Sequence, residues 1–179
     1  MEDFQINKYI DLCKCGNTDA FKYIVSEYQQ LVYTLAIKML CSEIDAEDII
    51  QETFIKAWQN ISRYKQQYKF STWIYKIAAN ACYDKLRSKH TVEEVSLMDY
   101  DIISETNQED LLQNKELKGL ILKFTSGLSP KQKLIFTLSE IEDLTVEEII
   151  QITGMTSSKI KSNLYLAKKY IKSKLMKYE

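Results

Sequence analysis

The chain has 179 residues, of which one is Pro and four are Gly, and its 24 Lys and Arg residues nearly balance 25 Asp and Glu residues. So few helix-breaking residues predict helices joined by short turns, and the length allows one domain or two small ones. Because the sequence has no apolar run long enough for a transmembrane helix and its start lacks the pattern of a signal peptide, we expect a cytoplasmic protein without membrane insertion.

The cysteines do not form a recognisable metal or redox motif. Cys13 and Cys15 lack the C-x-x-C spacing and a second pair, and His90 is the only histidine. We therefore expect reduced thiols, no metal site and no cofactor.

The near-zero net charge hides a strongly uneven distribution. Residues 60–90 carry seven Lys and Arg residues against one acid, and residues 150–179 carry seven Lys residues against one acid. Between them, residues 91–116 carry eight acids against one Lys. Two basic blocks around an acidic one predict two contact surfaces and a linker.

Three helices are expected before residue 60. Residues 4–15 have the pattern of a short helix, and apolar spacing over residues 21–39 predicts a longer, core-facing one. The third helix is predicted to begin with Asp45 as its N-cap and to bury Ile50, Phe54 and Trp58. Its remaining face carries Asp48, Gln51, Glu52 and Lys56. Taken alone, this face is typical of a solvated surface.

A basic, aromatic loop is predicted over residues 61–69, with Arg63, Tyr64, Lys65, Tyr68 and Lys69. Aromatic rings between cations suit single-stranded nucleic acid, because rings stack on bases while Lys and Arg follow the phosphates. The alternative is a surface loop whose tyrosines cap the core.

The helix predicted from Phe70 to Arg87 has a narrow polar stripe between two largely apolar faces. The apolar faces are Phe70, Ile74, Ile77 and Ala81, and Tyr75, Ala79, Cys82 and Leu86. The polar stripe is Lys76, Asn80, Tyr83 and Arg87, at helical spacing. These side chains match the phosphates, base edges and stacking faces of a nucleic-acid strand. The alternative is a solvated stripe on a core helix.

Residues 91–113 lose helical periodicity and accumulate acids, which predicts a flexible linker or a solvated spacer. Helical segments follow. An apolar stripe ends at Gly127, and capping boxes are expected at Ser129 with Gln132 and at Thr145 with Glu148. A helix that ends at Gly154 and a basic helix opened by Ser157 predict a helix-turn-helix. The exposed face expected to enter a major groove carries Ser158, Lys161, Ser162, Tyr165 and Lys169.

The runs from Asp45 to Trp58 and from Phe70 to Asn80 resemble the sigma factors of bacterial RNA polymerase, above all the small extracytoplasmic-function (ECF) group. Residues 144–169 resemble the −35-reading segment of the same proteins. Asn163 and Leu166 replace arginines common in the family, and Ser158-Lys159 replaces a Gly-Thr. These departures predict weaker contact with DNA or an unusual preferred sequence.

The resemblance also implies partners and residue roles. The side chains implied to grip a coiled coil of the largest polymerase subunits are Asp48, Gln51, Glu52 and Lys56. The loop at residues 61–69 and Asn80, Tyr83 and Arg87 are implied to capture the melted non-template strand of the −10 element. The acidic linker is implied to thread toward the RNA channels of the polymerase. An anti-sigma factor is a further expected partner.

We therefore predict an all-α protein with two small helical domains, residues 1–90 and 114–179, joined by an acidic linker over residues 91–113. Its predicted function is that of a sigma factor that binds core RNA polymerase and promoter DNA and assists strand opening. No catalytic constellation is visible, so the polymerase would supply the chemistry. The alternatives are a helix-turn-helix regulator that binds duplex DNA only and a protein that sequesters a polymerase or sigma subunit.

Overall fold

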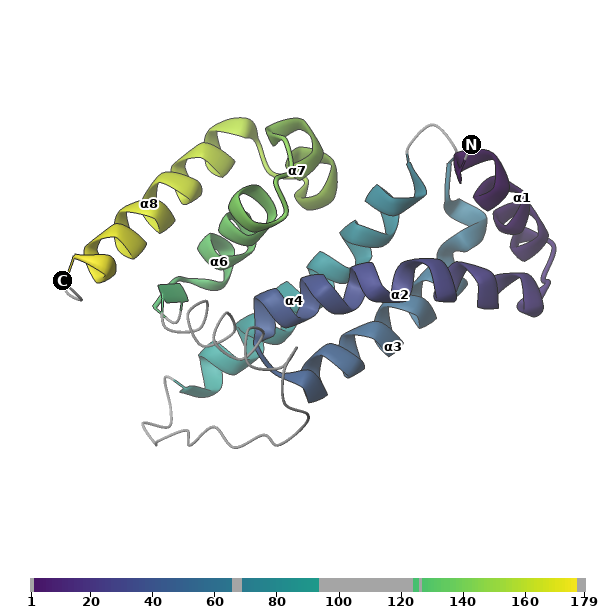
Figure 1. The fold of residues 1–179 in the computed structure, drawn as a ribbon, viewed down its shortest axis with the longest axis horizontal. Coiled ribbons are helices and arrows are strands. Elements are labelled where there is room, and N and C mark those ends of the chain that lie inside the picture. The colour runs from purple at the N-terminus through teal and green to yellow at the C-terminus, as the bar shows by residue number, and fades with distance from the viewer. Residues whose placement is uncertain (1, 66–68, 94–123, 126, 177–179) are drawn as a thin grey trace, which may run out of the picture.

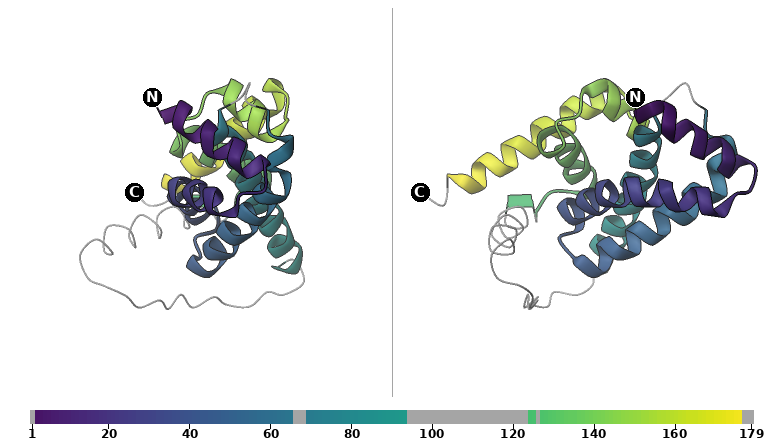
Figure 2. Two further views of the ribbon diagram at one scale, coloured as in Figure 1. Left: turned by 90° about the vertical axis from the view of Figure 1, so that its right-hand side faces the viewer. Right: turned by 45° about the vertical axis from the view of Figure 1, so that its right-hand side comes forward.

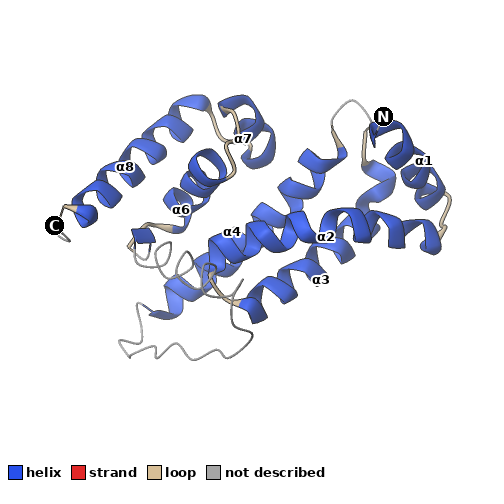
Figure 3. Cartoon of the chain, viewed as in Figure 1, coloured by secondary structure: helices blue, strands red, loops and turns tan. Residues whose placement is uncertain are grey.

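The computed structural model describes residues 2–65, 69–93, 124–125 and 127–176, and over these residues all regular elements are helical (Figure 3). The all-α prediction is therefore confirmed. In chain order the elements are α1 (Glu2–Lys14), α2 (Thr18–Leu40), α3 (Glu43–Asn60), the 3₁₀ turn η1 (Ile61–Arg63), α4 (Phe70–Glu93), α6 (Pro130–Phe136), the π-helical turn η2 (Thr137–Ile141), α7 (Val146–Thr153) and α8 (Ser157–Leu175).

The starts of α2 and α3 are fixed by side-chain caps. Asn17 accepts a hydrogen bond from the backbone N–H of Ala20 at 3.0 Å. The prediction that Asp45 caps α3 is wrong, because Ser42 takes that position and accepts from the N–H of Asp45 at 3.3 Å. Two cap-forming residues lie three positions apart here, and the earlier one starts the helix. Asp45 is thereby left inside the first turn, where its carboxylate is available to other partners.

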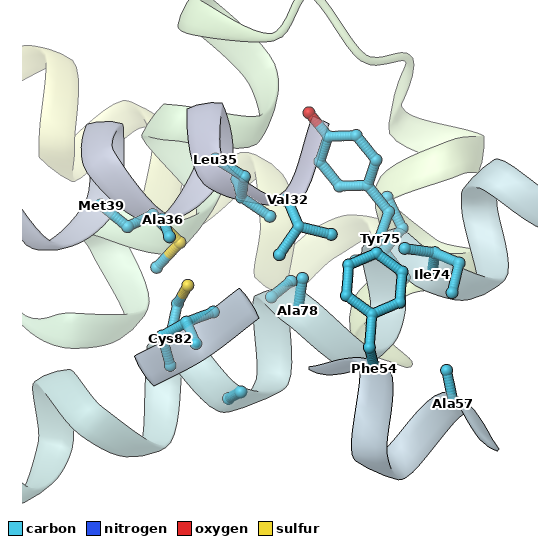
Figure 4. Close-up of a cluster of buried hydrophobic side chains, with 14 of the residues drawn as sticks. Val32, Leu35, Ala36, Met39, Phe54, Ala57, Ile74, Tyr75, Ala78 and Cys82 are labelled. Carbon is cyan, nitrogen blue, oxygen red and sulfur yellow. The ribbon is translucent and has the colours of Figure 1, made fainter. Parts of the chain in front are cut away.

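The two apolar faces predicted for α4 are confirmed. Phe70, Ile74 and Ala81 are buried from one face, and Tyr75, Ala79 and Cys82 from the other. Figure 4 shows side chains of α4 packed among those of α2 and α3, including Val32, Leu35, Phe54 and Ala57. A helix buried on two sides holds its remaining polar stripe at a fixed angle, so α4 positions every candidate site residue that it carries.

Both capping boxes predicted for the C-terminal helices are present. Ser129 and Gln132 exchange hydrogen bonds at the start of α6, and Thr145 and Glu148 do the same at the start of α7. Gly154 ends α7 with a positive φ of 69° that favours glycine. α8 begins at Ser157 as predicted, and Thr156 before it is the N-cap. The order of short helix, turn and long basic helix confirms the predicted helix-turn-helix.

The structure adds one element that the sequence pattern does not indicate. α6 passes directly into the π-helical turn η2, after which Asp143 adopts a positive φ of 51°. A π-helical turn inserts an extra residue per turn and so redirects the chain that follows it. Here it places Glu142 against α2 and α4.

The helices form two units that pack on each other. The N-terminal unit is α1–α4, and the C-terminal unit is α6–α8; Figures 1 and 2 show the latter alongside α4 and α2. One buried hydrophobic cluster runs through both units, from Ile10 to Ile160. The predicted domain boundaries stay predictions, although α4 continues to Glu93. The predicted linker lies mostly outside the described residues, as does the apolar stripe before Gly127 except for Phe124.

Candidate nucleic-acid interface

A basic groove runs along the N-terminal unit between α3, η1 and α4. It consists of two adjoining hollows of about 570 and 300 Å³, within the size range of ligand pockets in proteins. Arg63, Trp73 and Lys76 line both hollows. The remaining lining residues are Lys56, Gln59, Asn60, Ile77 and Asn80 in the larger hollow, and Tyr64, Lys65, Thr72 and Gln151 in the smaller one.

In the groove, Lys76 and Asn80 of the polar stripe lie beside the Trp73 ring of the same helix. Lys76 and Asn80 are exposed, and Trp73 lies one turn before Lys76 on the same face. Trp73 was missed by sequence reasoning, although its i, i+3, i+7 spacing with Lys76 and Asn80 was a usable signal. The groove can therefore offer positive charge for phosphates, an amide for a base edge and a ring for stacking.

Tyr64 has a different position from that expected of a base-stacking residue. Only 5% of it is exposed, and its ring packs against Phe70 and Trp73 with centroid distances of 5.0 and 5.3 Å. The ammonium of Lys14 lies 5.7 Å from the ring centroid. For Tyr64, the alternative prediction, that a tyrosine of this loop caps the core, is therefore confirmed. Tyr68 lies outside the described residues.

The other two members of the predicted stripe lie further along α4, beyond the lining of the groove. The Arg87 guanidinium is 6.0 Å from the centroid of the Tyr83 ring and forms an ion pair with Asp84 at 3.4 Å. Arg87 and Asp84 are exposed, and Tyr83 is partly buried. This cation–ring pair continues the line of the groove toward the end of α4.

The face of α3 predicted to bind polymerase is exposed. Asp48, Gln51, Glu52 and Lys56 all lie at the surface, and Lys56 pairs with Glu52 on the same helix. Two apolar side chains missed by sequence reasoning flank this face: Ile44 is 77% exposed and Ile55 is 57% exposed. Their helical spacing with Asp48 and Gln51 was the available signal. Each is a single exposed aliphatic side chain at one end of the acidic face.

A charge cluster fixes this face relative to α4. Lys85 contacts Asp45 at 3.2 Å and Asp48 at 3.3 Å, and Lys89 forms a second ion pair with Asp45. Burial favours the neutral form of Asp45, but hydrogen bonds from Lys89, Ser42 and Lys85 outweigh it and lower its pKa. Hydrogen bonds to Asp45 and Asp48 raise the pKa of Lys85. Two lysines of α4 therefore hold acids of α3 in place.

The five residues predicted for the DNA-facing side of α8 are all exposed: Ser158, Lys161, Ser162, Tyr165 and Lys169. Ile160 and Ala167 are buried on the opposite side. Asn163, where the family commonly has an arginine, is partly buried and donates from its side-chain amide to the carbonyl of Lys159 at 2.8 Å. Leu166, the other replacement, is 45% exposed. The helix presents a face with Lys161 and Lys169, and neither Asn163 nor Leu166 adds a charge to it.

In the described part of the chain, no group of three or more His, Cys, Asp and Glu residues lies together in a way that could hold a metal ion. Among the helices described, none is both long enough and apolar enough to cross a membrane.

A helical unit with a basic, aromatic groove, together with a helix-turn-helix, is typical of a nucleic-acid-binding protein. Residues 24–91 match the family model of sigma-70 region 2, and residues 118–171 match that of sigma-70 region 4. The chain belongs to the ECF group of the sigma-70 family of RNA polymerase sigma factors. As a member of this family, it directs RNA polymerase to promoters.

Relatives match nearly the whole chain. The ECF RNA polymerase sigma factor SigW of Bacillus subtilis (strain 168) is 30% identical over 97% of this chain and 98% of its own length. The ECF RNA polymerase sigma-E factor of Haemophilus influenzae is 29% identical over 89% of each chain.

Two solved structures share the fold. CnrH in complex with the cytosolic domain of CnrY gives a TM-score of 0.70 at 16% identity, over 96% of this chain and 97% of that chain. The sigma factor RpoE in complex with the anti-sigma factor NepR from Bartonella quintana gives 0.66 at 20% identity, over 87% and 96%. At these identities the likeness supports the two-unit helical fold.

Proposed function

We propose that the basic groove captures the melted non-template strand of the −10 element and that this capture assists promoter opening. The observation that carries the proposal is the single row of Trp73, Lys76 and Asn80 on α4, opposite Arg63 in the same groove. A duplex presents its bases stacked and paired, so side chains that stack on and pair with bases favour the separated strand.

Each group in the groove has a role set by its chemistry. Arg63, Lys65 and Lys76 contact phosphates, and the indole of Trp73 provides a stacking face. Asn80 pairs with a base edge, which an amide does as donor and acceptor together. Stacking on an aromatic side chain is worth about 1–3 kcal/mol per base, enough to offset the unstacking of one base. Tyr83 and Arg87 extend this contact along α4.

We assign core polymerase binding to the exposed face of α3 and −35 recognition to α8. Asp48, Gln51 and Glu52 form the acidic centre of the α3 face, and Lys56 lies where this face meets the basic groove. On α8, Lys161, Ser158, Ser162 and Tyr165 contact base edges, and Lys169 contacts phosphate. All chemistry belongs to the polymerase.

An anti-sigma factor is a proposed further partner. The two structural neighbours are complexes, one of them with a protein named as an anti-sigma factor. The exposed Ile44 and Ile55 provide apolar surface that such a partner can cover. We place this activity in the cytoplasm, where polymerase and promoter DNA are found.

The proposal is tested by replacing Asn80 with Ala and following transcription by the holoenzyme reconstituted with core polymerase. We expect slower opening of a duplex promoter, measured as permanganate reactivity of bubble thymines, with unchanged core binding. A template with mismatched −10 bases is already open, so the variant no longer has to melt the duplex. The base contact of Asn80 is still missing, so we expect transcription to recover only in part. Gln29→Ala, which changes an exposed amide on α2 outside the groove lining, is the matched control.

Two outcomes would contradict the proposal. An Asn80→Ala protein that melts duplex promoters at the parental rate with the same sequence preference would remove the groove from strand capture. A parental protein that binds promoter duplex tightly without core polymerase, and supports no initiation with it, would instead favour the helix-turn-helix regulator.

A further inference from the structure

The larger hollow of the basic groove has two walls. Its first wall is the row on α4 that consists of Trp73, Lys76, Ile77 and Asn80. The second wall comes from the end of α3 and from η1, and consists of Lys56, Gln59, Asn60 and Arg63. Both rows have the spacing i, i+3, i+4, i+7, which places their side chains on one face of a helix. The groove therefore offers side chains from two helical rows to a strand that lies between them.

On the second wall, the amide of Asn60 is already occupied. Its side-chain N–H donates to the carbonyl of Lys56 at 2.9 Å, and its side-chain oxygen accepts from the Arg63 guanidinium at 3.5 Å. Both ends of this amide have a partner within the protein, so Asn60 orients Arg63 and does not present its amide to a base.

Gln59 presents its amide to the groove. Its side chain is exposed and makes no side-chain hydrogen bond to the part of the chain that the structure describes. An amide offers a donor and an acceptor side by side, which matches the paired hydrogen-bonding groups of a base edge. The unstacked bases of a separated strand expose these edges to side chains.

Resting on the proposed function, we propose that Gln59 is a second base-reading residue, which recognises a neighbour of the base that Asn80 pairs with. The two amides stand on opposite walls of a hollow of about 570 Å³, and each uses both of its groups on one base edge. Trp73 of the same hollow provides the stacking face. The helix that carries the polymerase-binding face thus also determines part of the −10 preference.

The test measures base preference position by position. Holoenzyme reconstituted with core polymerase selects from promoter templates whose non-template −10 bases are unpaired and randomised, and the retained templates are sequenced. Gln59→Ala should lose a preference of roughly tenfold at one position and keep the parental preference at the others, as expected for one lost amide–base pair. Asn80→Ala should lose its preference at a different position.

Gln59→Glu provides a readout that a merely structural role would not change. A carboxylate accepts hydrogen bonds but donates none. Guanine is the base with two adjacent donors, N1–H and N2–H, on its Watson–Crick edge. The preference at the position lost in Gln59→Ala should therefore shift to guanine in Gln59→Glu.

Gln29→Ala is the matched control, because it removes an exposed amide from α2, outside the groove lining. It should retain the parental preference at every position. Core binding, measured for each variant, should equal that of the parent and shows that the variants fold.

Three results would overturn this proposal: a Gln59→Ala protein with the parental preference throughout, one weakened equally at all positions, or a Gln59→Glu protein with no shift to guanine. A loss at the same position as in Asn80→Ala would also overturn it, since both amides would then read one base. The proposed function fails separately, when Asn80→Ala melts duplex promoters at the parental rate with unchanged preference.

Discussion

At the start of α3, the Asp45 carboxylate lies at the centre of the charge cluster that joins α3 to α4. It is largely buried, and its partners Lys85 and Lys89 come from the second half of α4. Removing one member of such a cluster leaves cations without their counter-charge. Asp45 therefore adds a polar link to the hydrophobic packing that places the exposed face of α3 relative to α4.

We predict that Asp45→Asn lowers the free energy of unfolding by about 1–2 kcal/mol at neutral pH, a value reduced by the partial exposure of both lysines. Because the pKa of Asp45 in the folded protein is below its ordinary value of 3.8, its contribution is present above that value and is lost as the pH falls below it. Denaturant unfolding from pH 7 to pH 3 should show the difference between parent and variant shrinking.

Asp19→Asn is the control for this prediction. Asp19 pairs with Lys22 at 2.8 Å, but both side chains are exposed, so stability should not change at either pH. A parent and Asp45→Asn variant of equal stability at pH 7 would show that the cluster does not hold the helices together.

At the scale of single residues, the sequence predicts whether a side chain is buried or exposed where helical periodicity decides it. Lys76 and Asn80 are exposed as expected because their neighbours at apolar spacing are buried. The prediction for Tyr64 was wrong: its ring was expected at the surface, but contacts with Phe70, Trp73 and Lys14 place it in the core. Spacing within a loop does not encode such contacts, so Tyr64 could not be distinguished from a surface aromatic.

Among the elements, α8 is proposed to make two kinds of DNA contact, and the two should respond differently to salt. We predict that Lys161→Ala reduces discrimination at the −35 element by about 1–3 kcal/mol, as for a lost base contact. Lys169→Ala should weaken binding to all sequences and make the slope of affinity against salt shallower by about one unit. Holoenzyme binding to promoters with intact and altered −35 elements, measured over a range of salt concentrations, checks both.

Lys168→Ala provides the comparison on the same helix. Lys168 pairs with Glu140 at 2.8 Å and is not on the predicted face. Identical salt slopes for the parent and the Lys169→Ala variant would remove that residue from the DNA interface.

Helix boundaries were predictable where a local motif decides them. The capping boxes at Ser129 and Thr145 are complete within four residues each, and both are present. The start of α3 was mispredicted because Ser42 and Asp45 are both good caps and the sequence does not rank them. The turn η2 was missed because it depends on Glu142 reaching α2 and α4, partners more than sixty residues away.

For the whole molecule, the shared hydrophobic cluster predicts that the two units unfold together. Calorimetry of the parent should show one cooperative transition. Glu142→Gln should split it, with the C-terminal unit unfolding at the lower temperature because it has the smaller core of its own. Two separate transitions in the parent, or one unchanged transition in the variant, would show that the contact between the units contributes little.

The docking of the units was only partly foreseeable. The sequence predicts two domains and a linker because the charge blocks separate them. The second apolar face of α4 was nevertheless a signal, since a helix buried on two sides needs two partners. Tyr75 of that face donates its hydroxyl hydrogen bond to the C-terminal unit, and Figure 4 shows this hydroxyl directed away from Phe54 and Ile74. Periodicity shows that α4 has a second buried face, but it does not show which other element packs against that face.

The position of Lys14 over the Tyr64 ring has a consequence for how promoter preference changes during evolution. α1 lies before residue 24, where the match to sigma-70 region 2 begins, yet it supports the ring that forms part of the groove wall. Substitutions in α1 can reshape the surface that receives the bases without altering a residue that touches DNA. Lineages with the same contact residues can therefore diverge in the promoters they serve through a segment that the shared family signature does not include.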